Sequence, residues 1–147
     1  MKESIMYHTI KEKAPNTKFW RVENTLNLGT PDIHAVNKYG SLWLEAKQLT
    51  LTASRDGHIV VPFRPAQFSW LRNYHRYGGT SLLGIVTEYG FFFARNDAIK
   101  EQYTRQEMHA VREFPFNSLD YDVESTWKDR LHFVLFDDLD AFFQRIV

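Results

Sequence analysis

The fold of this chain is decided by two alternating runs and the turn between them: Pro31-Asp32-Ile33-His34-Ala35-Val36, Lys38-Tyr39-Gly40 and Ser41-Leu42-Trp43-Leu44-Glu45-Ala46-Lys47. Alternation of apolar and polar residues predicts strands, and Lys38-Tyr39-Gly40 is typical of a hairpin turn. Residues two apart in a strand point to the same face, so Glu45 and Lys47 face the same side. If the hairpin closes near Tyr39, Asp32 lies beside both of them at one end of the ribbon.

Two carboxylates and an ammonium at one point predict a metal-dependent phosphodiesterase site. Mg²⁺ takes oxygen ligands and usually needs one or two carboxylates plus substrate phosphate. Asp32 and Glu45 supply the carboxylates, the backbone carbonyl of Ala46 supplies a further oxygen, and Mn²⁺ is an alternative ion. Lys47 has only donors, so its predicted role is to position or deprotonate the attacking water or to hold the scissile phosphate. The alternative is a surface hairpin with solvated charges, but the combination at this spacing favours the site.

These residues also carry a family resemblance. Gly29-Thr30-Pro31-Asp32 followed by Glu45-Ala46-Lys47 resembles the signature of the PD-(D/E)XK nuclease superfamily. Residues 64–71, closed by Tyr77-Gly78-Gly79, resemble the glutamine-bearing helix of its VRR-NUC and archaeal-type Holliday-junction-resolvase branches. Residues 19–24 resemble the strand leading into the active-site hairpin of small phage-encoded members. The resemblance covers about residues 17–95 and implies a restriction-endonuclease-like, three-layer α/β sandwich with a central mixed β-sheet flanked by helices.

The resemblance implies two further site residues. Gln67 is expected in the first turn of its helix, where it would hydrogen-bond Lys47, the attacking water or a phosphate; the alternative is a solvated helix residue. A further acid often comes from an N-terminal helix in this family, and Glu3, Glu12 and Glu23 compete for that role. Glu23 ranks first, because it is nearest to the hairpin and belongs to the matching stretch.

Composition limits the other possibilities. The 147 residues are expected to form a single domain spanning residues 1–147, large enough for a substantial core. The absence of cysteine excludes disulfides, iron–sulfur clusters and cysteine-based zinc sites. It fits a reducing compartment, and we expect a cytoplasmic location, that of the host if the protein is phage-encoded. No stretch of the sequence is long and apolar enough to predict a membrane-spanning helix. The sequence also lacks a glycine-rich phosphate-binding loop, and we expect no organic cofactor.

Charge is balanced overall but not along the chain. Eighteen basic residues match eighteen acidic ones, so the net charge provides no general attraction to nucleic acid. Residues 64–79, however, contain Arg64, Arg72 and Arg76 and no acid, whereas residues 120–140 are strongly acidic. We therefore predict that these three arginines and a mobile segment, residues 50–58, line a DNA path on the side of Lys47.

The remaining patterns predict a regular order of elements. Helices are expected over residues 2–13, 65–77, 97–112 and 139–146, the last capped by Asp137-Asp138. Strands are expected over 18–23, 31–37, 41–47, 59–61, 81–86, 91–94 and 131–136, with 81–86 apolar enough to be central. This order also favours an α/β sandwich around a mixed sheet.

Two functions follow as hypotheses. The first is a Mg²⁺-dependent DNA endonuclease, acting on branched or junction DNA in phage or mobile-element replication, recombination or repair. The second is a catalytically silent DNA-binding or interaction subunit that retains the nuclease fold. The presence of Asp32, Glu45 and Lys47 together favours the first, and the neutral net charge mildly favours the second. A resolvase would need a homodimer with two sites about a twofold axis; phenylalanines 133, 136, 142 and 143 could form that interface, although core packing is favoured.

Overall fold

The computed structural model describes residues 3–22, 29–53, 57–118 and 127–147. Its strands are β1 (Lys18–Arg21), β2 (Ile33–Asn37), β3 (Gly40–Gln48), β4 (His58–Val60), β5 (Ser81–Thr87), β6 (Gly90–Arg95), β7 (Gln102–Thr104) and β8 (Leu131–Val134). Its α-helices are α1 (Glu3–Lys13), α2 (Gln67–Arg76), α3 (Arg105–Glu113) and α4 (Leu139–Ile146), with short 3-10 helices η1 (Leu51–Ala53), η2 (Asn96–Ala98) and η4 (Phe136–Asp138).

The predicted hairpin is confirmed and lies within the main sheet. Strands β2 and β3 pair in antiparallel fashion with Asn37 opposite Gly40, which leaves Lys38 and Tyr39 in the turn. The main sheet has the order β1-β2-β3-β5-β6-β8, and a second sheet pairs β4 with β7. Strand β3 runs parallel to β5, whereas the other neighbours in the main sheet are antiparallel. The main sheet is therefore mixed, as expected.

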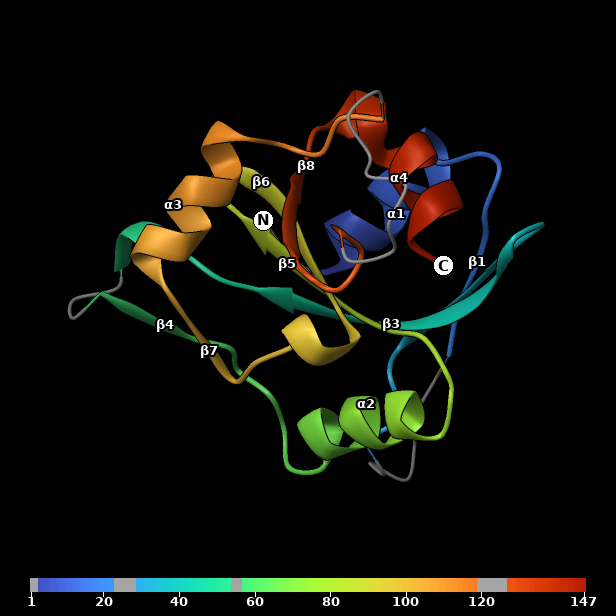
Figure 1. The fold of residues 1–147 in the computed structure, drawn as a ribbon, viewed down its shortest axis with the longest axis horizontal. Coiled ribbons are helices and arrows are strands. Elements are labelled where there is room, and N and C mark those ends of the chain that lie inside the picture. The colour runs from blue at the N-terminus through green and yellow to red at the C-terminus, as the bar shows by residue number, and fades with distance from the viewer. Residues whose placement is uncertain (1–2, 23–28, 54–56, 119–126) are drawn as a thin grey trace.

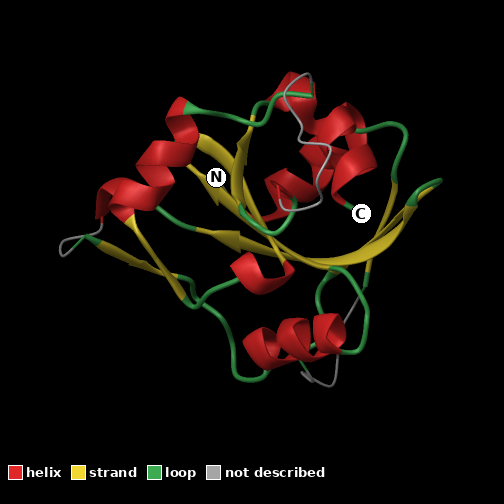
Figure 2. Cartoon of the chain, viewed as in Figure 1, coloured by secondary structure: helices red, strands yellow, loops and turns green. Residues whose placement is uncertain are grey.

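Helices cover both faces of the main sheet (Figures 1 and 2). Helices α1 and α4 bury apolar side chains, among them Ile10 and Phe142, against one face that includes Leu44. Helix α2 lies across the other face, where Leu71 belongs to a second apolar cluster with Ile85. Strand β5 is buried along its whole length, as its apolar sequence predicted. The α/β sandwich with a central mixed sheet flanked by helices is confirmed.

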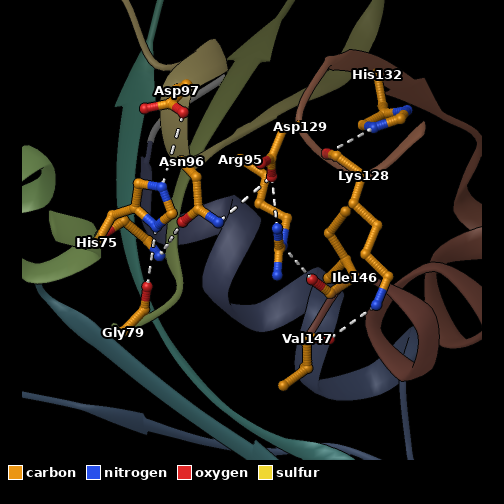
Figure 3. A network of polar contacts seen from close by, with 11 residues as sticks. His75, Gly79, Arg95, Asn96, Asp97, Lys128, Asp129, His132, Ile146 and Val147 are labelled. Carbon is orange, nitrogen blue, oxygen red and sulfur yellow. Dashed lines mark hydrogen bonds and ion pairs between the residues drawn. The ribbon is translucent and has the colours of Figure 1, made fainter. Parts of the chain in front are cut away.

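A polar network joins α4 to β6 and the segment before β8 (Figure 3). Arg95 Nε donates to the carbonyl of Ile146 at 2.6 Å, and the Arg95 guanidinium also pairs with Asp129. Lys128 Nζ donates to the carbonyl of Val147 at 3.2 Å. Cationic donors thus satisfy carbonyls at the C-terminal end of the helix, where such groups are left without intrahelical partners.

The helix predicted over residues 97–112 is wrong in its first half. That segment contains η2 and β7, and α3 begins only at Arg105. The start is fixed by a capping box, because Thr104 Oγ1 accepts from the Glu107 N–H at 3.0 Å and Glu107 Oε1 accepts from the Thr104 N–H at 2.7 Å. Upstream, Tyr103 is buried and pairs with Ile59 in the β4–β7 sheet.

Several predicted boundaries also shift. Helix α2 begins two residues after Pro65, because Ala66 is left-handed, with φ 75°. Strand β8 ends at Val134, and Asp138 precedes α4 without making a side-chain cap hydrogen bond. Among the four C-terminal phenylalanines, only Phe136 is exposed and the others are core residues. The end of the predicted strand at residue 23 and residues 54–56 of the predicted mobile segment lie outside the described residues, and residues 51–53 form η1.

No helix within the described part of the chain is both long enough and apolar enough to cross a membrane.

Candidate active site

The strand register brings the hairpin acids together. Ile33 pairs with Leu44, so one residue further along Asp32 faces Glu45. Asp32 Oδ1 accepts from the backbone N–H of Ala46 at 3.4 Å, which ties the end of one strand to the other. Leu44 and Ala46 point into the core beneath α1, so Glu45 and Lys47 point to the opposite face. The structure therefore brings Asp32, Glu45 and Lys47 to one place.

Glu45 is buried, with 4% of its surface exposed. Its Oε1 accepts from Gln67 Nε2 at 3.0 Å and lies 3.5 Å from Lys47 Nζ. Its Oε2 is buried and has no hydrogen-bond partner among the described residues. Native structures rarely leave a buried polar atom unpaired, and such atoms commonly mark a site for an ion or a ligand. One oxygen of Glu45 is therefore held in place by the protein, and the other is available.

Gln67 holds that carboxylate from the first residue of α2. Its side chain is buried, its Nε2 donates to Glu45, and its Oε1 accepts from the Arg64 N–H at 2.7 Å. The sequence resemblance pointed to Lys47, water or phosphate as its partner, and the structure gives Glu45 instead. Because both ends of the amide are bonded, Gln67 fixes the orientation of Glu45 rather than being a solvated helix residue.

Burial changes the acidity of the two carboxyl groups. The pKa of Glu45 is raised to about 8, mainly by burial and also by the neighbouring charge of Asp32, against the opposing effect of Lys47. Burial also raises the pKa of Asp32, although the N–H of Ala46 opposes that change. Because the charge of each acid disfavours ionisation of its neighbour, Asp32 and Glu45 resist ionising together. A cation bound between them would remove that penalty.

These groups line a cavity of about 360 Å³ on the α2 side of the sheet. Its walls are formed by Glu3, Val22, Gly29, Thr30, Asp32, Glu45, Lys47, Pro62, Arg64 and Gln67. Among the three candidates for the additional acid, Glu3 lines this cavity from the start of α1, and Glu12 is exposed near the end of that helix. Glu23, which ranked first from the sequence, lies outside the described residues.

The donor set fits a hard divalent cation that is shared with a substrate. Within the described ranges, no group of three or more His, Cys, Asp or Glu side chains is arranged to hold a metal. Mg²⁺ does not require such a group, because it keeps several waters and is commonly held by one or two carboxylates together with substrate phosphates. Asp32 and the available Oε2 of Glu45 meet that requirement, and the described lining contains no His or Cys side chain of the kind that closed zinc sites use.

Comparison with known proteins gives only remote likenesses, among solved structures. No family model matches the chain, and no curated protein matches it. Among solved structures, the chain is similar to Hjc, a Holliday junction resolvase from the archaeal hyperthermophile Archaeoglobus fulgidus. The two share 16% identity, with 62% of this chain and 70% of that chain covered, at a TM-score of 0.44.

The three predicted DNA-binding arginines do not form one group. Arg64 lines the cavity. Arg72 lies over the ring of Phe68, 5.6 Å from its centroid, and Arg76 is exposed in the last turn of α2. Nine residues separate Arg76 from the inward-facing Gln67, about 180° around the helix. Arg72 and Arg76 therefore belong to the outer surface of α2, and only Arg64 is placed beside the acids.

Sequence reasoning missed the wall contributed by Val22 and Pro62. Val22 is placed there because its N–H donates to the carbonyl of Asp32 at 2.8 Å, which continues the β1–β2 pairing toward the site. The position of Val22 follows from the register of an edge strand, and no local signal in the sequence marks it. Pro62 follows β4 and belongs to the connection that leads to α2.

Proposed function

We propose that this protein is a divalent-metal-dependent endodeoxyribonuclease of the PD-(D/E)XK type, which hydrolyses phosphodiester bonds in DNA. The observation that carries the proposal is the Glu45 carboxylate: it is buried, held at one oxygen by Gln67, and unpaired at the other. Asp32 and Lys47 accompany it in the same cavity.

The residues have distinct roles in this proposal. Asp32, Glu45 and the backbone carbonyl of Ala46 hold Mg²⁺ or Mn²⁺, which when bound supplies Lewis-acid polarisation of the phosphate and acidifies water. Lys47, with its ammonium 3.5 Å from Glu45 and almost fully buried, holds the scissile phosphate or orients the attacking water. Gln67 keeps Glu45 in place.

The positive charge of Arg64 beside the acids fits a phosphate-bearing substrate. Arg64 lines the cavity beside the acids, and its guanidinium provides a bidentate donor for phosphate oxygens. Glu3 is the additional acid in this proposal, because it lines the same cavity and its charge contributes to the raised pKa of Glu45. A role on branched DNA in phage or mobile-element replication, recombination or repair is supported only by the sequence resemblance and is part of the proposal.

A second function is favoured by one observation. The net charge is zero, which is unusual for a protein that must attract a polyanion. A catalytically silent DNA-binding or interaction subunit with the same fold would satisfy that observation. The intact set of Asp32, Glu45, Lys47 and Gln67 supports the enzyme over this alternative.

The two are separated by a cleavage assay. A panel of labelled DNAs (duplex, single strand, flap, fork and four-way junction) is incubated with Mg²⁺, Mn²⁺ or chelator. We expect cleavage with either ion, none with chelator, and none by Glu45→Gln, whereas the matched surface variant Glu12→Gln cuts like the wild type. Absence of metal-dependent cleavage on every substrate would support the silent subunit. Paired, symmetric nicks by a dimer would identify a junction resolvase.

A further inference from the structure

A row of aromatic rings crosses one end of the main sheet. Trp20 on β1 stacks on His34 of β2 with ring centroids 6.0 Å apart, and His34 contacts Trp43 of β3 at 4.7 Å. Trp43 in turn meets Trp70 of α2 at 5.7 Å, and Trp70 stacks on Tyr74 at 5.1 Å. These five rings, joined by four successive contacts across three strands and a helix, are here called the aromatic row.

The aromatic row lies on the same face of the sheet as the candidate site. Trp43 precedes Glu45 by two residues, and His34 follows Asp32 by two, so all four side chains point to the α2 side. In the register, Trp20, His34 and Trp43 face one another across the strands, just as Asp32 faces Glu45 two residues further along the same strands. Two residues of a strand span about 7 Å. The rings of His34 and Trp43 therefore lie about 7 Å along the strands from the carboxylates of Asp32 and Glu45.

The row is accessible and its surroundings are basic. Trp20 is 46% exposed on the edge strand, and the other rings of the row are partly exposed. The Lys18 ammonium lies over the Trp20 ring, 5.8 Å from its centroid. Apart from the cavity residues, the segments 17–22, 31–48 and 57–87 contain five lysines and arginines and no acid. Outside the site, this part of the chain favours a polyanion even though the whole chain is neutral.

We infer that the aromatic row stacks unpaired bases of the DNA strand whose phosphate enters the candidate site, an inference that rests on the nuclease function proposed above. Aromatic platforms beside positive charge bind single strands because every base has a face that can stack. A fully paired duplex keeps its bases inside and cannot use the row. The preferred substrate class is therefore DNA with an unpaired stretch next to the scissile phosphate, such as a flap or a fork, rather than a blunt duplex.

Trp20 is the residue with which to test this inference, because it is exposed on an edge strand and is not among the residues that line the cavity. Binding of labelled oligo(dT), of blunt duplex and of a flap is measured by fluorescence anisotropy in chelator, so that no cleavage interferes. We expect Trp20→Ala to weaken oligo(dT) and flap binding about 5- to 150-fold, because stacking of one base on an aromatic ring contributes about 1–3 kcal/mol. Trp20→Phe, which keeps a ring, should restore most of the affinity, and duplex binding should not change.

Phe114→Ala is the matched control, because Phe114 is an aromatic residue with 82% exposure beyond the end of α3 and outside the row. It should leave all three affinities unchanged. Equal loss of duplex and single-strand binding in Trp20→Ala would overturn the inference. It would also be overturned if Trp20→Ala bound oligo(dT) as tightly as the wild type does. Dissociation of a dimer by Trp20→Ala would assign the row to contact between copies and would also overturn it.

The two proposals fail separately. Loss of oligo(dT) binding in Trp20→Ala together with no metal-dependent cleavage of any DNA would support the stacking row while refuting the nuclease. Metal-dependent cleavage of blunt duplex and flap at equal rates, unaffected by Trp20→Ala, would refute the row while supporting the nuclease.

Discussion

Replacement of Glu45 by glutamine should stabilise the metal-free protein, and the gain should grow with pH. Burial raises the pKa of this carboxyl from 4.5 to about 8, so the folded protein holds a proton there that the unfolded chain has already released. Folding stability contributed by that proton is present below pH 4.5 and is lost as the pH rises toward 8. Glutamine keeps the oxygen that accepts from Gln67 and has no charge to bury.

The size of the effect follows from that pKa. A change of about 3.5 pH units at roughly 1.4 kcal/mol each gives an upper value of about 5 kcal/mol. Relaxation around the charge reduces this value. We expect the stability advantage of Glu45→Gln over the wild type to be about 3–5 kcal/mol larger at pH 9 than at pH 4.5. For a chain of this size, that corresponds to a rise in Tm of roughly 10 °C.

Urea unfolding in chelator at a series of pH values measures the difference directly. Glu12→Gln removes an exposed carboxylate from α1 and should show no comparable pH-dependent gain. Mn²⁺ should stabilise the wild type, by about 2.7 kcal/mol at a hundred times its Kd, and should do little for Glu45→Gln. A stability difference between Glu45→Gln and the wild type that is the same at pH 5 and pH 9 would refute the reasoning.

Three further changes test separate parts of the site. Lys47→Ala should lower single-turnover cleavage about 10²–10⁴-fold and keep Mn²⁺ binding, and calorimetry that finds no Mn²⁺ binding would make Lys47 a structural residue instead. Glu3→Gln should impair cleavage more than Glu12→Gln, because only Glu3 lines the cavity; an equal effect of both in the same cleavage assay would remove Glu3 from the site. Gly29→Ala should destabilise the fold by roughly 1–3 kcal/mol, measured by urea unfolding, because the added Cβ would lie 2.5 Å from the carbonyl oxygen of Ala66; unchanged stability would show that this contact gives way easily.

The hairpin and the central strand could be predicted because their signals are local. Alternation around Lys38-Tyr39 fixes both the turn and the face of each residue, and that face puts Glu45 and Lys47 together. All seven residues of β5 are buried, and the apolar run Leu82-Leu83-Gly84-Ile85-Val86 within it is typical of a strand covered on both faces. The start of α3 has a local signal as well, since Thr104 and Glu107 have capping-box spacing, although the charged residues before them also predict helix.

The depth of the site could not be predicted, because it depends on contacts between distant residues. Glu45 would be a solvated acid on an open hairpin if α2 did not cover its face. The hydrogen bond that holds it comes from Gln67, 22 residues later. Burial, the raised pKa and the unpaired oxygen all follow from that helix, and the strand pattern contains no information about them.

Two left-handed residues lie where the turn before α2 meets the segment before Asp32: Gly29 with φ 83° and Ala66 with φ 75°. The segment before Asp32 and the turn before Gln67 pack backbone against backbone at these two residues, too close for a side chain on Gly29. Glycine adopts this conformation freely, whereas alanine pays about 1–2 kcal/mol for it. Strain of this kind persists where surrounding contacts enforce it, and it concentrates at functional sites. Ala66 has that strain one residue before Gln67, the residue that fixes Glu45. The strained turn at Ala66 therefore accompanies the placement of the Gln67 amide against the Glu45 carboxylate.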